Sequence, residues 1–272
     1  MDIRVESIVN ALNDNEIHHN TFKRGNSWLH CHQAFRKYAG KTLDNDTYEL
    51  LALHLAFYLA SWGMYRGSSF LLDLDYKIHI EPVKLMMHEK YCWLFNCKNP
   101  FANNEGDRYY SLLFGPDGIY PKLEAYYLKA HQSIAQQRRK YDEERPNKKS
   151  RKAKYDPTRE SDTLLTKILL GVYGCIPAYD RYFKQGISLF DKQQSLIAKK
   201  NAVCQGPKAL CTLLQDCKLQ KDLDAYWQKN IGKYTFMKVV DMYFFSLGAL
   251  LDEAEVDLDT LKHQIAEQYG HS

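Results

Sequence analysis

The sequence predicts an all-α protein. Apolar residues recur at spacings of three and four along almost the whole chain, and no stretch alternates apolar and polar residues as a strand does. Hydrophobic residues make up 45% of the 272 residues, which is enough to fill the core of one large domain or of two packed lobes. With only 14 Gly and 8 Pro, the composition excludes disordered, collagen-like and low-complexity chains.

The apolar pattern also predicts where the helices lie. The predicted ranges are 2–13, 27–39, 47–74, 81–97, 107–114, 121–141, 162–173, 177–186, 188–203, 207–219, 221–231, 234–252 and 257–269. Side chains that can cap a helix N-terminus are Ser27, Asp46 and Asp162, and prolines suited to a first turn are Pro82, Pro121 and Pro207. Helix ends are expected at Gly40, at the GPDG turn of residues 115–118 and at Gly206.

The most hydrophobic stretch is LLALHLAFYLASWGMY, residues 50–65, and it ends at Arg66-Gly67-Ser68-Ser69. A membrane-spanning helix needs a longer run without an arginine. We therefore expect a central helix buried on all sides and no membrane partner.

Positive charge is concentrated in one segment. Residues 138–159 hold ten basic and four acidic residues, a net charge of +6, whereas the remaining 27 basic and 29 acidic residues leave −2. Such a segment either tracks a phosphate backbone or is a solvated linker. We expect residues 142–161 to be a basic hinge between an N-terminal lobe, 1–141, and a C-terminal lobe, 162–272.

Cysteine usage points to a reduced compartment. The seven cysteines are an odd number, and the chain opens with MDIRVESIVN, which is not a signal peptide. We therefore expect a cytoplasmic protein with reduced thiols. The spacing of the cysteines lacks the short pairs of a zinc site, so we expect no metal. We also expect no cofactor. Walker, dinucleotide-binding, HExxH and GxSxG motifs do not occur, which removes support for nucleotide hydrolysis, Rossmann redox chemistry and hydrolase-elbow mechanisms.

The start of the C-terminal lobe carries the strongest chemical signal. A helix ends at Gly174, Pro177 begins the next helix, and Asp180 lies in the first turn of that helix. The helix dipole favours an ionised carboxylate there, which can stabilise a cationic transition state or orient a water molecule. The alternative is an ordinary ion pair with Lys184 at i+4.

The stretch LLTKILLGVYGCIPAYDRYF resembles the catalytic region of helix-hairpin-helix DNA glycosylases. In that match, residues 172–174 end the second hairpin helix and residues 178–182 form the segment that carries the catalytic aspartate, Asp180. The resemblance implies a two-lobed helical domain, double-stranded DNA as the partner, no cofactor, and a monomer that hydrolyses the bond between a flipped base and its sugar.

The match departs from that family in the hairpin. Members usually have Leu-Pro-Gly-Val-Gly, whose amides hold a phosphate, but residues 156–161 read DPTRES, so Arg159 and the basic segment would take that role. No lysine lies between Thr158 and Thr163, which implies a monofunctional enzyme with water as the nucleophile, although Lys154 is close by. The iron–sulfur cysteines of some members are absent from the C-terminus.

A glycosylase also needs a pocket for the extruded base and positive charge for the DNA backbone. The candidate pocket residues are Trp62, Tyr65, Arg66, Ser68, Ser69, Asn26, Trp28 and Tyr179, and the candidate DNA-binding residues are Arg24, Lys148, Lys149, Arg151, Lys152, Lys154, Arg159 and Arg181. Trp62 and Tyr65 could stack the base, and Arg66 could read its polar edge, or else pair with Asp73. Equally, Ser27 could be an N-cap and Trp28 a core residue.

Arg66 and its neighbouring serines favour a polar, bulky, modified base. In this respect the chain is similar to bacterial anti-phage glycosylases that remove glucosylated hydroxymethylcytosine.

Two other functions fit the sequence. The first is a non-enzymatic helical adaptor whose basic segment docks nucleic acid or an acidic protein. The second is a ribonuclease, because Arg24-x5-His30 resembles the R-x4–6-H pattern of HEPN ribonucleases.

Overall fold

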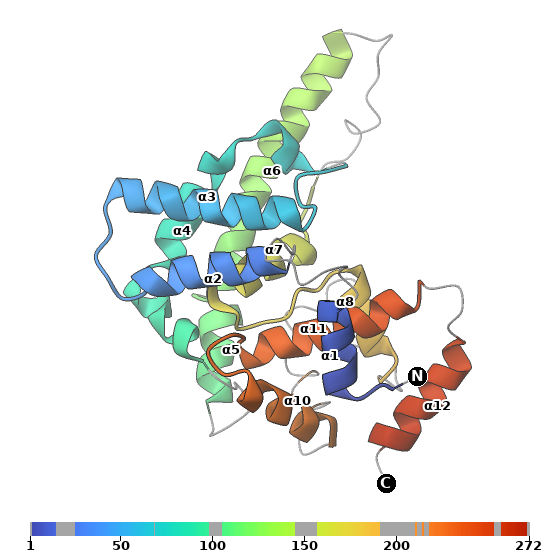
Figure 1. The fold of residues 1–272 in the computed structure, drawn as a ribbon. Coiled ribbons are helices and arrows are strands. Elements are labelled where there is room, and N and C mark those ends of the chain that lie inside the picture. The colour runs from blue at the N-terminus through green and yellow to red at the C-terminus, as the bar shows by residue number, and fades with distance from the viewer. Residues whose placement is uncertain are drawn as a thin grey trace.

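The computed structural model is all-α, which confirms the predicted fold class (Figure 1). It describes residues 2–14, 25–67, 69–97, 105–144, 157–190, 210, 214, 218–252 and 257–270. Within these residues, the regular structure consists of α-helices and short 3-10 helices, with a single isolated bridge between Ile231 and Tyr234 in place of any sheet. No helix among the described residues is long and apolar enough to cross a bilayer.

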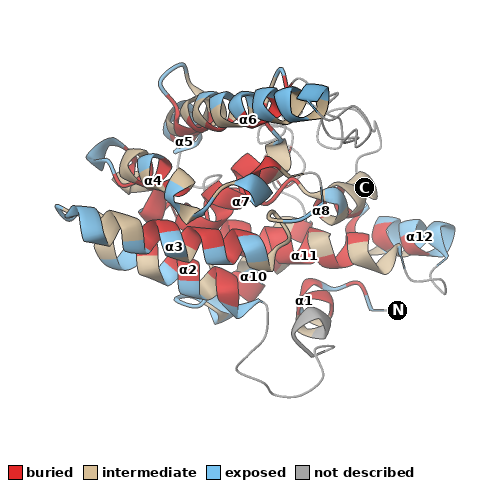
Figure 2. Ribbon diagram, turned by 90° about the horizontal axis from the view of Figure 1, so that it is seen from above, coloured by how far each residue is buried: buried red, intermediate tan, exposed pale blue. Residues whose placement is uncertain are grey.

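The described residues of the first half of the chain contribute nine elements, of which α2, α3, η3 and α6 contact α7. They are α1 (Val5–Asp14), α2 (Asn26–Tyr38), α3 (Asn45–Ser61), η1 (Phe70–Asp73), η2 (Tyr76–His79), α4 (Ile80–Met86), η3 (Glu89–Asn96), α5 (Gly106–Phe114) and α6 (Ile119–Glu144). The second half contributes α7 (Asp162–Tyr173), α8 (Arg181–Ser188), α10 (Lys218–Lys229), α11 (Phe236–Leu250) and α12 (Leu258–Tyr269). Figure 2 shows that α7 and α11 are buried along most of their length, whereas α6 and α12 expose one face.

Three predicted helices are wrong at their boundaries. The range 47–74 is α-helical only as far as Ser61, because the chain turns at Gly63, with φ 75°, and again at Gly67, with φ 66°, before the 3-10 helix η1. The range 81–97 divides into α4 and η3. The helix expected at 177–186 begins instead at Arg181. The ranges 188–203 and 207–219 lie largely outside the described residues.

The predicted caps also shift by a few positions. Asp44, not Asp46, caps α3 by accepting a hydrogen bond from the Thr47 N–H at 2.8 Å. Ser27 lies inside α2, and Ser161 rather than Asp162 precedes α7. The helices themselves were predicted, and their N-terminal caps differ from the predicted ones by one or two positions.

One hydrophobic core joins both halves of the chain. The first helix, α1, packs against α10 and α11, elements from the other end of the sequence (Figure 1). Two tyrosines fix this arrangement, because the Tyr226 hydroxyl donates to Asn10 Oδ1 at 3.1 Å and the Tyr243 hydroxyl donates to the Ile3 carbonyl at 3.1 Å. The N-terminal helix therefore lies with the C-terminal elements, while α2 and α3 contact α7.

A very close helix contact joins α8 to α11. A Cβ on Gly186 would lie 1.9 Å from the Phe244 carbonyl oxygen, and a Cβ on Gly248 would lie 1.8 Å from the Tyr182 carbonyl oxygen. The two helix backbones are in direct contact at these glycines. This contact fixes α8, and with it the side chain of Asp180 at its N-terminus, against α11.

Candidate functional site

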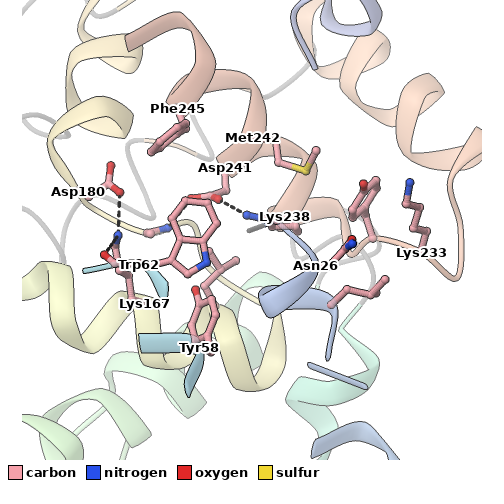
Figure 3. A pocket seen from close by; sticks show the side chains of 15 residues that line it. Asn26, Tyr58, Trp62, Lys167, Asp180, Lys233, Lys238, Asp241, Met242 and Phe245 are labelled. Carbon is pink, nitrogen blue, oxygen red and sulfur yellow. Dashed lines mark hydrogen bonds and ion pairs between the residues drawn. The ribbon is translucent and has the colours of Figure 1, made fainter. Parts of the chain in front are cut away.

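Two adjoining cavities lie where α2, α3, α7, α8 and α11 meet. The inner cavity is lined by Gly25, Asn26, Leu29, Tyr58, Trp62, Lys167, Leu170, Ala178, Asp180, Lys233, Tyr234, Lys238, Asp241, Met242 and Phe245 (Figure 3). The outer cavity is lined by Ala60, Ser61, Trp62, Gly63, Met64, Arg66, Thr163, Lys167, Asp180, Arg181, Tyr182 and Phe245. Four residues belong to both, namely Trp62, Lys167, Asp180 and Phe245.

Asp180 is the N-cap of α8. Its Oδ1 accepts a hydrogen bond from the Phe183 N–H at 3.1 Å, and its backbone is extended, with φ −84° and ψ −177°. Its Oδ2 lies 3.1 Å from Lys167 Nζ, and the side chains are 13% and 7% exposed, respectively. The ion pair therefore forms across from α7 rather than with Lys184 on the same helix. Asp180 is not a lone anion, but it does face both cavities.

The backbone before Asp180 is held by hydrogen bonds from α7. Tyr179 donates its N–H to Thr166 Oγ1 at 2.9 Å, and its carbonyl accepts from Thr163 Oγ1 at 2.9 Å. These bonds hold the Tyr179 backbone in a turn outside the helix and satisfy both of its polar groups. This is why α8 begins after Asp180 and not at Pro177.

Two residues near α11 hold the rest of this turn. Gly174 ends α7 in the left-handed conformation, with φ 64°, and its carbonyl accepts a hydrogen bond from Thr235 Oγ1 at 2.6 Å. Asp241 Oδ1 accepts a hydrogen bond from the Ala178 N–H at 2.9 Å. The position of Asp180 is thus fixed from α7 and α11 before any ligand enters.

A second buried ion pair lies in the inner cavity. Lys238 Nζ is 2.7 Å from Asp241 Oδ2, and the side chains are 9% and 7% exposed. The ammonium groups of Lys238 and Lys167 both lie over the Trp62 ring, at 5.5 and 5.4 Å from its centroid. Trp62 is anchored because its Nε1–H donates to Ser27 Oγ at 3.2 Å.

Four of the predicted site residues other than Asp180 line a cavity. Asn26 and Trp62 line the inner cavity, and Trp62, Arg66 and Arg181 line the outer one. Arg66 is exposed. It does not pair with Asp73, because that carboxylate pairs with Arg138 at 2.6 Å.

Other predicted residues serve the core or its edges. Trp28 is fully buried, and its Nε1–H donates to the Leu170 carbonyl at 2.8 Å. Tyr179 is fully buried, Tyr65 hydrogen-bonds His79 at 2.7 Å, and Ser69 caps η1. Arg159 pairs with Asp162 at 2.7 Å and with Glu124 at 3.6 Å. None of these side chains lines either cavity. Predicted residues outside the described part of the chain are Arg24, Ser68, Lys148, Lys149, Arg151, Lys152 and Lys154.

Three charged residues of the site, Lys167, Lys238 and Asp241, were not predicted from the sequence. Each carries a charge inside a helix that is otherwise apolar, DTLLTKILLGVY for Lys167 and FMKVVDMYFF for the other two. A charged residue in such a stretch must find a partner, because burying an unpaired charge is costly. A charge within an apolar helix was therefore the sequence signal that could have identified these three residues. In the described residues, no group of three or more His, Cys, Asp or Glu side chains is arranged to bind a metal ion.

Comparisons with protein-family models, with curated proteins and with solved structures find no match to this chain.

Proposed function

We propose that the protein is a DNA N-glycosylase-like enzyme that hydrolyses the bond between a flipped, modified base and its sugar. One observation carries the proposal: Asp180, Trp62 and Arg66 line the same cavity, with Lys167 and Arg181 beside them. Trp62 and Arg66 lie far before Asp180 in the sequence, and the fold brings the carboxylate, the aromatic ring and the cation to one opening.

Asp180 supplies the chemistry. As the glycosidic bond breaks, positive charge develops on the sugar, and a carboxylate close to it stabilises that charge while it orients the attacking water. A carboxylate has about four lone-pair sites. The Phe183 N–H and the Lys167 ammonium engage one each, so the substrate would contact the sites that they leave open.

Lys167 sets a condition on this mechanism. Its ammonium balances the charge of Asp180, so the developing sugar cation meets a paired carboxylate. The Lys167 side chain is buried, at 7% exposure, where the local dielectric constant is low. The low dielectric constant strengthens the attraction between Lys167 and Asp180 and also the attraction between Asp180 and the sugar cation. A base that enters next to Trp62 and a phosphate near Arg66 would then bracket Asp180.

The test is excision of bases from plain and hypermodified phage DNA, measured as abasic sites. We expect the wild type to form them and Asp180→Asn to be slower by about 10²- to 10³-fold, the usual effect of removing one stabilising group. Asn caps a helix as well as Asp does, so α8 should persist. In Asp180→Asn, the buried Lys167 ammonium loses its carboxylate partner. The double variant Asp180→Asn/Lys167→Met removes that ammonium as well.

The matched control is Asp257→Asn, which alters an aspartate N-cap at α12 outside both cavities. It should leave excision unchanged. Absence of abasic sites with every DNA, or full activity of Asp180→Asn, would overturn the proposal. DNA binding without excision would instead favour the adaptor, and RNA cleavage lost in His30→Ala would favour the ribonuclease.

A further inference from the structure

The two cavities differ in charge, and this difference bears on which part of a ligand each one holds. The inner cavity contains two complete ion pairs, Lys167–Asp180 and Lys238–Asp241. Its only other charged lining residue among those described, Lys233, is exposed and lies 4.9 Å from the Tyr234 ring centroid. The buried interior is therefore electroneutral overall.

The outer cavity has an excess of positive charge. Arg66 is exposed at its edge, and no ion pair joins it to another described residue. Arg181 lies on the same wall, paired with Asp252 beyond the cavity. Three cations line the outer cavity with one carboxylate, Asp180, whereas the inner cavity has three cations and a second carboxylate, Asp241, so an anionic group is attracted more strongly to the outer side.

The inner cavity also contains a hydrogen-bond donor and an acceptor side by side. Lys238 Nζ offers N–H donors, and Asp241 offers acceptor lone pairs 2.7 Å away. The walls around this pair include the rings of Tyr58, Trp62 and Phe245 (Figure 3). A donor and an acceptor side by side, within aromatic walls, suit the edge of a flat heterocycle that itself carries an acceptor beside a donor.

We propose that the inner cavity is a subsite for an uncharged, planar nitrogen heterocycle, read by Lys238 and Asp241, and that the outer cavity holds the anionic part of the same ligand. This inference deepens the proposed function and rests on it for the identity of the heterocycle as a nucleobase. Asp241 has a second role, because it also holds the Ala178 N–H two residues before Asp180. Recognition of the heterocycle and the position of Asp180 thus depend on one side chain.

The test measures binding of small probes by calorimetric titration, without catalysis. Free cytosine, uracil and adenine probe the inner cavity, and inorganic phosphate probes the outer one. The decisive variant is Lys238→Met/Asp241→Asn, which removes both charges together and so avoids a buried charge without a partner. Its matched control is Lys84→Met/Glu81→Gln, an exposed ion pair with the same i,i+3 spacing outside both cavities.

We expect at least one heterocycle to bind the wild type and the control equally, and to bind the Lys238/Asp241 double variant at least about 10-fold more weakly, the loss expected for buried hydrogen-bonding groups. Phosphate binding should be unchanged in the double variant, weakened by Arg66→Gln, and reduced by salt, whereas heterocycle binding should not depend on salt. Thermal unfolding of each variant checks that it is folded.

The inference is overturned if no heterocycle binds the wild type, if the folded double variant binds as well as the wild type, or if the double variant loses phosphate binding instead. Its failure is distinguishable from that of the proposed function. Heterocycle binding with no excision of any DNA base would remove the enzyme proposal alone. Normal excision by the double variant would remove the Lys238–Asp241 assignment alone.

Discussion

His32 and His79 are buried histidines that make folding depend on pH. Burial lowers the pKa of His32 to about 4 and that of His79 to about 3, from the ordinary value of 6.5. His79 bridges the hydroxyls of Tyr65 and Tyr127, each at 2.7 Å, and His32 bonds the Val172 carbonyl at 3.0 Å. Both therefore favour the neutral imidazole in the folded protein.

We expect the free energy of unfolding to be independent of these histidines above pH 6.5 and to fall as the pH drops below it. There the unfolded chain binds protons that the folded protein excludes, which costs about 1.4 kcal/mol per pH unit for each histidine until its folded pKa is reached. Urea unfolding of the wild type and of His32→Gln at successive pH values checks this. The slope between pH 6.5 and 4 should be shallower in the variant, and His263→Gln, on the exposed face of α12, should leave it unchanged. Equal slopes in wild type and His32→Gln would contradict the assignment.

At the level of single residues, the sequence singled out Asp180 as a candidate near the start of a helix, but it predicted neither the role of Asp180 as N-cap nor its partner. Asp180 could be singled out because Gly174 and Pro177 mark a helix end before it. Its pairing with Lys167 could not be predicted by helix periodicity, since Lys167 lies on another helix and 13 residues earlier, where only the tertiary packing decides which side chains meet. For the same reason, Trp28 and Trp62 looked alike in sequence, and only Trp62 reaches a cavity.

The contact between α8 and α11 leads to a prediction at the level of elements. Gly→Ala inside a helix ordinarily stabilises it by about 1 kcal/mol. Here Gly186→Ala or Gly248→Ala should instead destabilise the protein by about 1 to 3 kcal/mol, because the new methyl group meets backbone atoms of the other helix and forces the two apart. Chemical denaturation measures the change.

Gly25→Ala is the control for that series. Nothing lies within 4 Å of the point where a Cβ on Gly25 would stand, and its φ of −57° suits alanine, so the stability of this variant should stay close to that of the wild type. A stabilised Gly186→Ala protein would show that α8 and α11 separate without cost.

Helix existence was predictable and helix ends were less so. Apolar spacing located α2, α7 and α11, because each buries a face or its whole circumference. The end of α3 and the start of α8 depend on competing local signals: two glycines with positive φ end α3, and hydrogen bonds from Thr163 and Thr166 delay the start of α8. Such bonds join residues that are separate in sequence, so periodicity does not reveal them.

For the whole molecule, the shared core leads to a prediction about cooperativity. Since α1 packs on α10 and α11, and α2 and α3 pack on α7, neither half of the chain buries its apolar faces alone. We expect one unfolding transition. Tryptophan emission from a Trp227→Phe variant, which retains Trp28, Trp62 and Trp93 in the first half, should change at the same urea concentration as the far-UV circular dichroism. Two separated transitions would show that the lobes 1–141 and 162–272 unfold independently.

The placement of Trp62 has an optical consequence. Its indole lines both the inner and the outer cavity. The indole N–H is bonded to Ser27, and the ammonium groups of Lys167 and Lys238 lie over the ring. A molecule that binds in either cavity changes the electric field across this ring. We therefore expect the wavelength and intensity of Trp62 emission to change on binding. The protein thereby contains its own fluorescent sensor of occupancy, which needs no attached dye.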